Sequence, residues 1–321
     1  MCKYNVRSVK KDDLQLIKVL IDNYEFKPYS EYSFVSQTQL YKYIQYQVID
    51  FLNQKNNIAI LVEEGVKPLG FGCFNILTWD SQILDIKMAR LLYLISKENK
   101  LILKKHLLSY ILTESLNRNI KYLTCRINTR DFSILHLLGH HQFVVDEVLV
   151  KLSFNFKQNL TKDYELTCNI QEYHDKYFES IKEITYDNYA NRLLFDPKFS
   201  EQKIRKLYSK WAENCCKGRS DKIFVAEREN KCVGFIACNI LKSPSEIFDK
   251  KIGFIDLIIV DRYSQGLGIG YALLYAALNW FSNMVDIVEL GVRVDNYPAL
   301  NMYQKAGFKV ISSNFTLHKW L

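Results

Sequence analysis

Residues 254–282 read FIDLIIVDRYSQGLGIGYALLYAALNWFS. The first seven residues, apolar except for Asp256, predict a strand, and the apolar residues at the end of the segment recur at helical spacing. Three glycines join the strand to the helix: Gly266, Gly268 and Gly270. Glycines at a helix N-terminus let a phosphate approach the backbone N–H groups closely, so the pattern favours a phosphate-binding site. A tight turn between strand and helix without a ligand is the alternative reading. The spacing G-x-G-x-G excludes the GxGxxG dinucleotide fingerprint, and the absence of GK[ST] excludes a P-loop.

A second motif follows at residues 295–308, which read DNYPALNMYQKAGF. Asn296 is a suitable helix cap, Pro298 suits a first helical turn, and Gly307 is a typical helix end. The motif therefore predicts a short helix that carries Tyr303.

Together the two motifs resemble the GCN5-related N-acetyltransferase (GNAT) superfamily, in which a Q-x-x-G-x-G loop binds acetyl-CoA. The resemblance implies that loop amides hold the pyrophosphate, that the strand pairs with the pantetheine arm, and that Asn296 contacts the same arm. It also implies that Tyr303 contacts the cofactor and, as general acid, protonates the departing thiolate after direct attack by an amine. The cofactor-binding residues implied for the strand and the loop are Leu257, Ile258, Ile259, Val260, Gln265, Gly266, Leu267, Gly268, Ile269 and Gly270.

The chain also repeats itself. Residues 58–71 match residues 223–235, and residues 126–143 match residues 293–308, at offsets of 164 and 165 positions. Strands alternate with helices in both copies, which predicts an α/β fold (a mixed α+β sheet) built from two copies of one unit. With the resemblance above, this implies two tandem GNAT-like domains.

We place the predicted domains at residues 1–157 and 164–321, with the boundary in the polar segment 157–163. In the first copy, side chains stand where the second has the loop glycines and the tyrosine: Leu101, Leu103, Lys105 and Leu138. The first domain is therefore predicted to be degenerate, with neither a cofactor loop nor an acid.

A narrower resemblance links residues 195–221 to the bacterial N-acetyltransferases of dTDP-fucosamine, which acetylate the amine of a nucleotide-linked amino-deoxysugar. It implies this substrate class, polysaccharide biosynthesis and a set of substrate-binding residues: Phe195, Tyr208, Trp211, Asn214 and Trp79. Core packing is the alternative reading for Tyr208 and Trp211, and the sequence after Ser81 departs from the pattern around Trp79.

An attacking amine must be neutral, so a base is expected. Asp256 on the central strand is the candidate, and Glu289 on the next strand is the other; a paired strand carboxylate is the alternative reading for both. Two other functions stay open. One is acetylation of an antibiotic, a peptide or a polyamine, and the other is a non-catalytic acyl-CoA-binding scaffold.

Composition narrows the remaining classes. The chain has 321 residues, 48% of them apolar, and no apolar run reaches the ~18 residues of a membrane span. The net charge of +8 is spread along the chain, so nucleic-acid binding is not expected, and a small anionic ligand suits the charge equally well. Eight cysteines without a CxxC pair indicate reduced thiols in the cytoplasm. His136 and His140 have metal spacing but no third ligand, so no metal is expected; a homodimer is left open.

Overall fold

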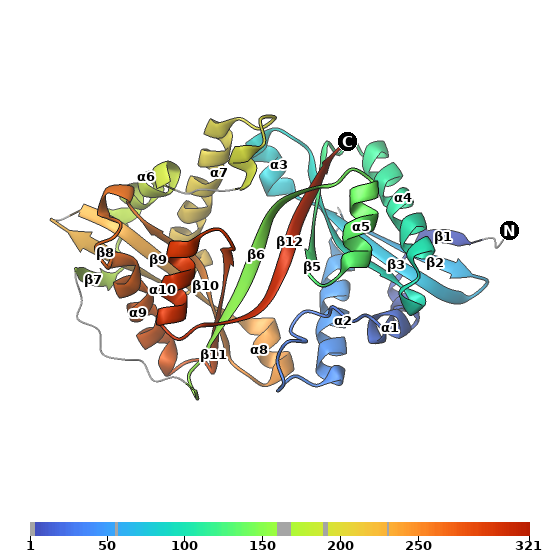
Figure 1. Cartoon of the computed structure of the whole chain (residues 1–321), viewed down its shortest axis with the longest axis horizontal. Coiled ribbons are helices and arrows are strands. Elements are labelled where there is room, and N and C mark those ends of the chain that lie inside the picture. Colours follow the sequence, from blue (N-terminus) through green and yellow to red (C-terminus); the bar gives the residue numbers. More distant parts are fainter. Residues whose placement is uncertain (1–3, 55–56, 159–167, 189–191, 230) are drawn as a thin grey trace. The chain divides into compact units, whose positions relative to one another are not determined.

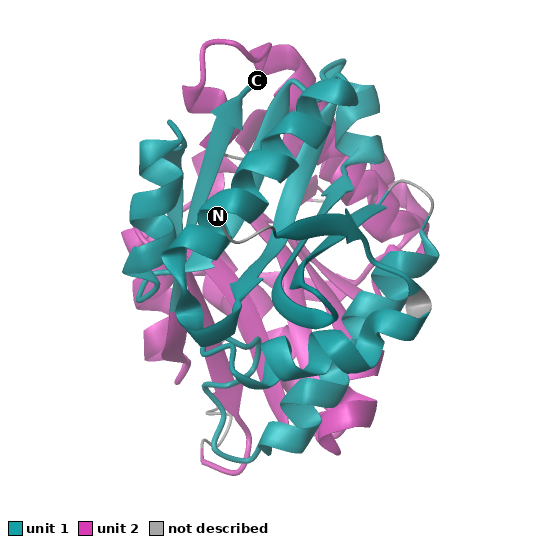
Figure 2. Cartoon of the chain, turned by 90° about the vertical axis from the view of Figure 1, so that its right-hand side faces the viewer, with its two compact units in different colours: residues 1–148, 313–321 teal, residues 149–312 magenta. Residues whose placement is uncertain are grey.

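The computed structural model describes residues 4–54, 57–158, 168–188, 192–229 and 231–321. It divides into two compact units, one of Met1–Val148 with Ser313–Leu321 and one of Leu149–Ser312 (Figure 1, Figure 2). Each unit holds a mixed sheet with helices on both faces, which confirms the predicted fold class.

The strands of unit 1 are β1 (Asn5–Ser8), β2 (Asn57–Glu64), β3 (Lys67–Ile76), β4 (Met88–Ser96), β5 (Tyr122–Asn128) and most of β12 (Lys309–Trp320). Its helical segments are η1 (Lys11–Asp13), α1 (Leu14–Asp22), α2 (Gln37–Asn53), α3 (Thr78–Leu84), η2 (Lys97–Asn99), α4 (Leu101–Asn117) and α5 (Phe132–His140). The strand order is β1-β2-β3-β4-β5-β12, and only β4 and β5 run parallel. Helices α1 and α2 bury one face of this sheet, and α4 and α5 bury the other.

The strands of unit 2 are most of β6 (Val144–Asn155), then β7 (Asn169–Glu172), β8 (Lys222–Arg228), β9 (Lys231–Leu241), β10 (Ile252–Val260) and β11 (Ile287–Arg293). Its helical segments are η3 (Asp175–Tyr177), α6 (Phe178–Asn188), η4 (Arg192–Phe195), α7 (Glu201–Asn214), η5 (Cys215–Arg219), α8 (Lys242–Phe248), η6 (Arg262–Ser264), α9 (Ile269–Ser282) and α10 (Tyr297–Lys305). The strand order is β6-β11-β10-β9-β8-β7, with β10 and β11 parallel. Helices α6 and α7 cover one face, and α9 and α10 cover the other.

The last strand of each half completes the sheet of the other half. Residues 149–155 of β6 pair with β11, and residues 314–320 of β12 pair with β5. The compact units therefore differ from the predicted domains 1–157 and 164–321 at these two strands. The reason is that each strand pairs with a sheet edge formed by distant residues, which the order of elements in the chain does not indicate. Residues 159–163 of the predicted boundary lie outside the described residues. That each predicted domain is a folding module stays a prediction.

The repeat is visible in the details of both units. Ser36 caps α2 and Ser200 caps α7, each through its side-chain oxygen, 164 positions apart. The β3–β4 and β9–β10 pairs each contain a bulge, which places Leu92 and Asp256 at matching positions. Local geometry therefore supports the offset that the sequence predicts.

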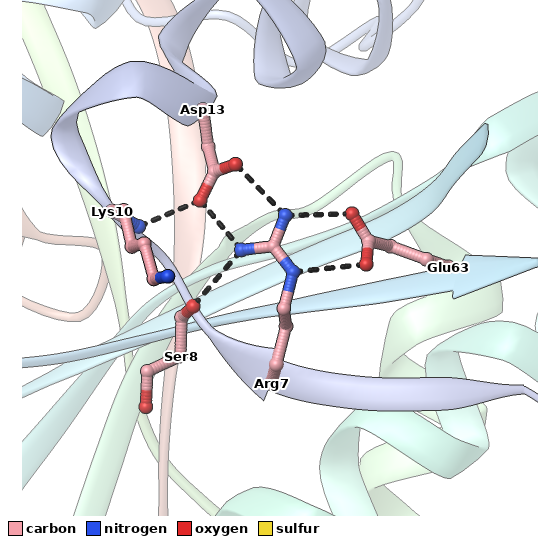
Figure 3. A network of polar contacts seen from close by, with 5 residues as sticks. All are labelled: Arg7, Ser8, Lys10, Asp13 and Glu63. Atoms are coloured by element: carbon pink, nitrogen blue, oxygen red, sulfur yellow. Dashed lines mark hydrogen bonds and ion pairs between the residues drawn. The ribbon is translucent and has the colours of Figure 1, made fainter. Parts of the chain in front are cut away.

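A polar network fastens the first strand of unit 1 (Figure 3). The Arg7 guanidinium on β1 binds the Asp13 carboxylate at 2.6 Å and the Glu63 carboxylate at 2.7 Å. The hydrogen bond from Arg7 lowers the pKa of Asp13. Positions 164 residues later form a connected group of the same kind in unit 2: Gln171, Tyr177 and Glu227. The charges differ between the copies, but the connection between strand, helical turn and hairpin is the same.

Among the described residues, we find no helix with the length and apolarity that crossing a bilayer requires.

Candidate functional site

The site begins where two parallel strands separate. Strands β10 and β11 pair only over Ile252–Ile255 and Ile287–Leu290, whereas β9 pairs with β10 as far as Val260. Beyond Ile255, therefore, the β11-facing edge of β10 has no partner strand among the described residues of unit 2. Such an edge presents alternating N–H and C=O groups to an extended ligand. This part of β10 consists of the residues that are predicted to pair with the pantetheine arm: Leu257, Ile258, Ile259 and Val260.

The glycine turn follows directly after β10. Gly266 and Gly268 have φ values of +78° and +79°, and Gly268 is the N-cap of α9. The Gln265 side-chain amide donates to the Val260 carbonyl at 3.1 Å, which ties the turn to the strand. The Ala272 N–H donates to the Gly268 carbonyl at 3.0 Å, so the N–H groups that precede Ala272 point out of the helix end.

The three glycines have different surroundings. A Cβ at Gly266 would meet no atom within 4 Å, which leaves open space in front of the turn. A Cβ at Gly270 would lie 3.1 Å from Met302 Sδ, so Gly270 lets α9 pack closely on α10. Leu267 is 46% exposed and Ile269 is buried in the core. The space at Gly266 is open, whereas Gly270 has a packing reason that the sequence did not reveal.

Helix α10 carries the predicted acid. The Asn296 side chain caps α10 by accepting from the Ala299 N–H at 3.3 Å. Tyr303 is only 4% exposed, and its ring lies 5.8 Å from the ring of Phe308. Its neighbour Met302 contacts the first turn of α9. Tyr303 therefore lies on the helix that packs beside the glycine turn, in the core of the same unit.

Asp256 lies at the bulge of β10, one residue past the last pair with β11. Its carboxylate accepts a hydrogen bond from the Trp211 indole N–H at 3.1 Å. The structure thus brings together a predicted base and a predicted substrate-binding residue. The Cys215 thiol lies 3.8 Å from the same oxygen, and burial raises its pKa to about 11, so it is protonated at neutral pH and is a poor nucleophile.

Glu289 is placed differently. It is 2% exposed, pairs with Lys151 at 2.8 Å, and stands opposite Phe254 where β10 and β11 are still paired. This agrees with its reading as a paired strand carboxylate. Asp256 is therefore the better candidate for a base.

The remaining predicted substrate residues are dispersed. Tyr208 is 8% exposed and its ring lies 5.8 Å from that of Trp211, as core packing predicts. Asn214 is the last, half-buried residue of α7. Phe195 is 72% exposed and stacks under Arg293 at 5.3 Å, close to the start of α10. Trp79 belongs to unit 1, on α3.

Unit 1 has other residues at the matching places. Leu101, Leu103 and Lys105 all lie within α4, so the glycine turn of unit 2 is replaced by helix. The buried Lys104 side chain donates to Asn99 and, at 3.3 Å, to Ser133. Leu138, at the position of Tyr303, is fully buried, and Leu92 stands at the bulge. These residues support the prediction that unit 1 lacks a cofactor loop and an acid.

The sequence reasoning missed Met302, Cys215 and Arg293 as neighbours of the site. Arg293 begins the repeated segment 293–308, and this signal could have identified it. The contacts of Met302 and Cys215 depend on how helices pack and leave no pattern in the chain.

Comparison with known proteins agrees with this geometry. Residues 185–308 match the acetyltransferase (GNAT) family. The chain is 31% identical over 153 residues to an uncharacterized N-acetyltransferase of Methanocaldococcus jannaschii (47% of this chain, 59% of the relative). It is 35% identical over 97 residues to an N-alpha-acetyltransferase of Sulfurisphaera tokodaii (27% and 56%). The chain thus spans less than two thirds of each relative.

Among solved structures, a tandem GNAT protein from the clavulanic acid biosynthesis pathway aligns with a TM-score of 0.62 and 11% identity. The alignment covers 99% of this chain and 98% of that one, which shows a shared fold. The predicted tandem architecture is confirmed. The match over residues 185–308 agrees with the predicted class, an acetyl-CoA-dependent N-acetyltransferase.

Proposed function

We propose that the chain moves an acetyl group from acetyl-CoA to a primary amine, because residues 185–308 match the GNAT acetyltransferase family. The observation that carries this proposal is the unpaired edge of β10, which leads directly into the glycine turn of α9. A thioester arm can extend along this edge while a pyrophosphate meets the outward N–H groups of the turn.

Each group of the site has a role in the proposed reaction. Amides around Gly266 and Gly268 bind the pyrophosphate, and Asn296 contacts the arm. Asp256 accepts the proton that the amine loses, and Tyr303 gives a proton to the sulfur as the C–S bond breaks and the N–C bond forms. Acetyl-CoA supplies an activated acyl group and a thiolate leaving group.

For the acceptor we propose the amine of a nucleotide-linked amino-deoxysugar. Support comes from the resemblance of residues 195–221 and from Phe195, an exposed aromatic ring paired with the Arg293 cation. The exposed ring suits stacking with a nucleotide base, whereas the Arg293 guanidinium already forms a two-point ion pair with Asp295. Under this proposal the product serves polysaccharide biosynthesis in the cytoplasm, and the contact of Trp79 with the sugar stays a prediction from the sequence.

A peptide α-amine is the second candidate, because one relative is named an N-alpha-acetyltransferase. The test is release of free thiol from acetyl-CoA with a panel of amines: dTDP- and UDP-linked amino sugars, peptides with free N-termini, aminoglycosides and polyamines. Turnover only with nucleotide sugars supports the first acceptor, and turnover only with peptides refutes it. Binding of acetyl-CoA without thiol release for any amine refutes catalysis in favour of an acyl-CoA-binding scaffold.

A further inference from the structure

The bulge in β10 decides where the Asp256 carboxylate points. Ile255 pairs with Cys238 and Leu257 pairs with Ala237, so Asp256 is an extra residue between consecutive partners. A bulge of this kind turns the inserted side chain away from strict alternation. Here Leu257 packs in the core beneath α6 and α7, and Asp256 points to the same side, where it meets Trp211 and Cys215.

The two oxygens of this carboxylate have different surroundings. Both hydrogen bonds that it makes with described residues, from Trp211 at 3.1 Å and from Cys215 at 3.8 Å, end on Oδ2. Asp256 is half-buried, so it is neither sealed in the core nor fully solvated. One oxygen is therefore fixed by the protein, and Oδ1 is left to receive a proton from another molecule.

Trp211 is itself held in place. The Tyr208 ring, also on α7, lies 5.8 Å from the Trp211 ring, and the Arg219 guanidinium lies over the Trp211 ring at 5.5 Å. An indole that is clamped on its ring can offer its N–H in a fixed direction, and a hydrogen bond to a charged acceptor is stronger than one between neutral groups.

We propose that Trp211 is a positioning residue that holds Asp256 through Oδ2, so that Oδ1 takes the proton from the acceptor amine. This inference rests on the proposed function and gives Trp211 a different role from the substrate contact that its sequence context suggests. In the step, the acceptor nitrogen loses a proton to Oδ1 and forms the N–C bond; the C–S bond breaks, and the sulfur gains a proton from Tyr303.

Unit 1 supports the proposal that the indole and the carboxylate act together. At matching positions, 164 residues earlier, Leu92 replaces the carboxylate at the bulge and Gln47 replaces the indole on α2. Gln47 instead accepts a hydrogen bond from Tyr93 at 2.8 Å. The unit without the glycine turn thus lacks both members of the pair.

The experiment is a double-mutant cycle of Trp211→Phe and Asp256→Asn, with thiol release as the assay. Trp211→Phe keeps an aromatic ring and removes the N–H, and we expect kcat to fall about ten- to a hundredfold with the KM for acetyl-CoA unchanged. Asp256→Asn should lower kcat by two to four orders of magnitude. Adding Trp211→Phe to Asp256→Asn should then change kcat by less than twofold. Trp280→Phe, on the far end of α9, is the matched control and should keep wild-type kinetics.

Multiplied losses in the double variant would overturn the proposal, because a substrate contact acts independently of Asp256. A second measurement does not need activity. The chain has four tryptophans, so ¹H–¹⁵N spectra of wild type and the single Trp→Phe variants assign each indole N–H. Asp256→Asn should move the Trp211 indole resonance and leave the other three in place. An unmoved resonance refutes the pair itself, whereas a moved resonance without thiol release for any amine refutes the proposed function and the role in it.

Discussion

Substitution of Gly266 by alanine separates the binding role of the glycine turn from its backbone strain. Gly266 has a φ of +78° and open space where a Cβ would lie. Gly65, in the hairpin turn of unit 1, has a φ of +62° and the same open space. Alanine in this left-handed conformation costs about 1–2 kcal/mol, so each variant should lose a similar part of its stability. For units of this size that is roughly 2–8 °C in Tm.

Of the two substitutions, only Gly266→Ala should weaken the binding of acetyl-CoA. At Gly266 the new Cβ would enter the open space beside the turn whose amides we propose to bind the pyrophosphate. The loss of one hydrogen bond to a charged phosphate costs about 1.5–3 kcal/mol, which corresponds to roughly a ten- to a hundredfold weaker Kd.

The assay is calorimetric titration of acetyl-CoA into both variants, with Tm measured on the same preparations. We expect Gly65→Ala to bind like wild type. A Gly266→Ala variant that loses Tm as Gly65→Ala does but keeps the wild-type Kd would refute the assignment of this turn to the pyrophosphate.

Three further predictions follow from the structure. Tyr303→Phe removes one hydroxyl from a packed ring, so kcat should fall by one to three orders of magnitude with little change in acetyl-CoA affinity; wild-type turnover would remove Tyr303 from the mechanism. Calorimetry should give one acetyl-CoA per chain, because helix replaces the turn in unit 1; a stoichiometry of two would contradict this. Hydrogen bonds from Lys210 and Lys217 lower the pKa of Glu213 to about 2, so its contribution to stability is complete above pH ~4.5 and is lost as the pH falls toward 2. Glu213→Gln should therefore flatten urea-unfolding stability over this interval, and an unchanged slope would show that the ion pairs do not contribute.

The sequence predicted those features whose cause is local. A glycine turn between a strand and a helix, an asparagine cap and the 164-residue repeat all appear in the structure where the sequence indicated them. Each depends on backbone conformation within a few residues, so the residue types are informative by themselves.

Features that depend on distant packing were not predictable. Strand β6 and strand β12 have similar apolar patterns, and nothing local says which sheet edge each one joins. The bulge at Asp256 follows from register with β9, and the bond to Trp211 spans 45 positions. Gly270 was assigned to the ligand because its role in packing against Met302 exists only once α9 and α10 are folded.

Strands β6 and β12, each of which completes the sheet of the other half, also determine the order in which the nascent chain can fold. Almost all of unit 1 is synthesised before unit 2. Its residues 122–128, however, pair with residues 314–320, which are synthesised about 190 positions later. The edge of β5 must therefore wait until residues 314–320 have been synthesised, and pairings of such long range form slowly. During this interval β5 offers an unpaired edge to other nascent chains. For the same reason a chain that stops before residue 313 lacks one strand of the sheet of unit 1.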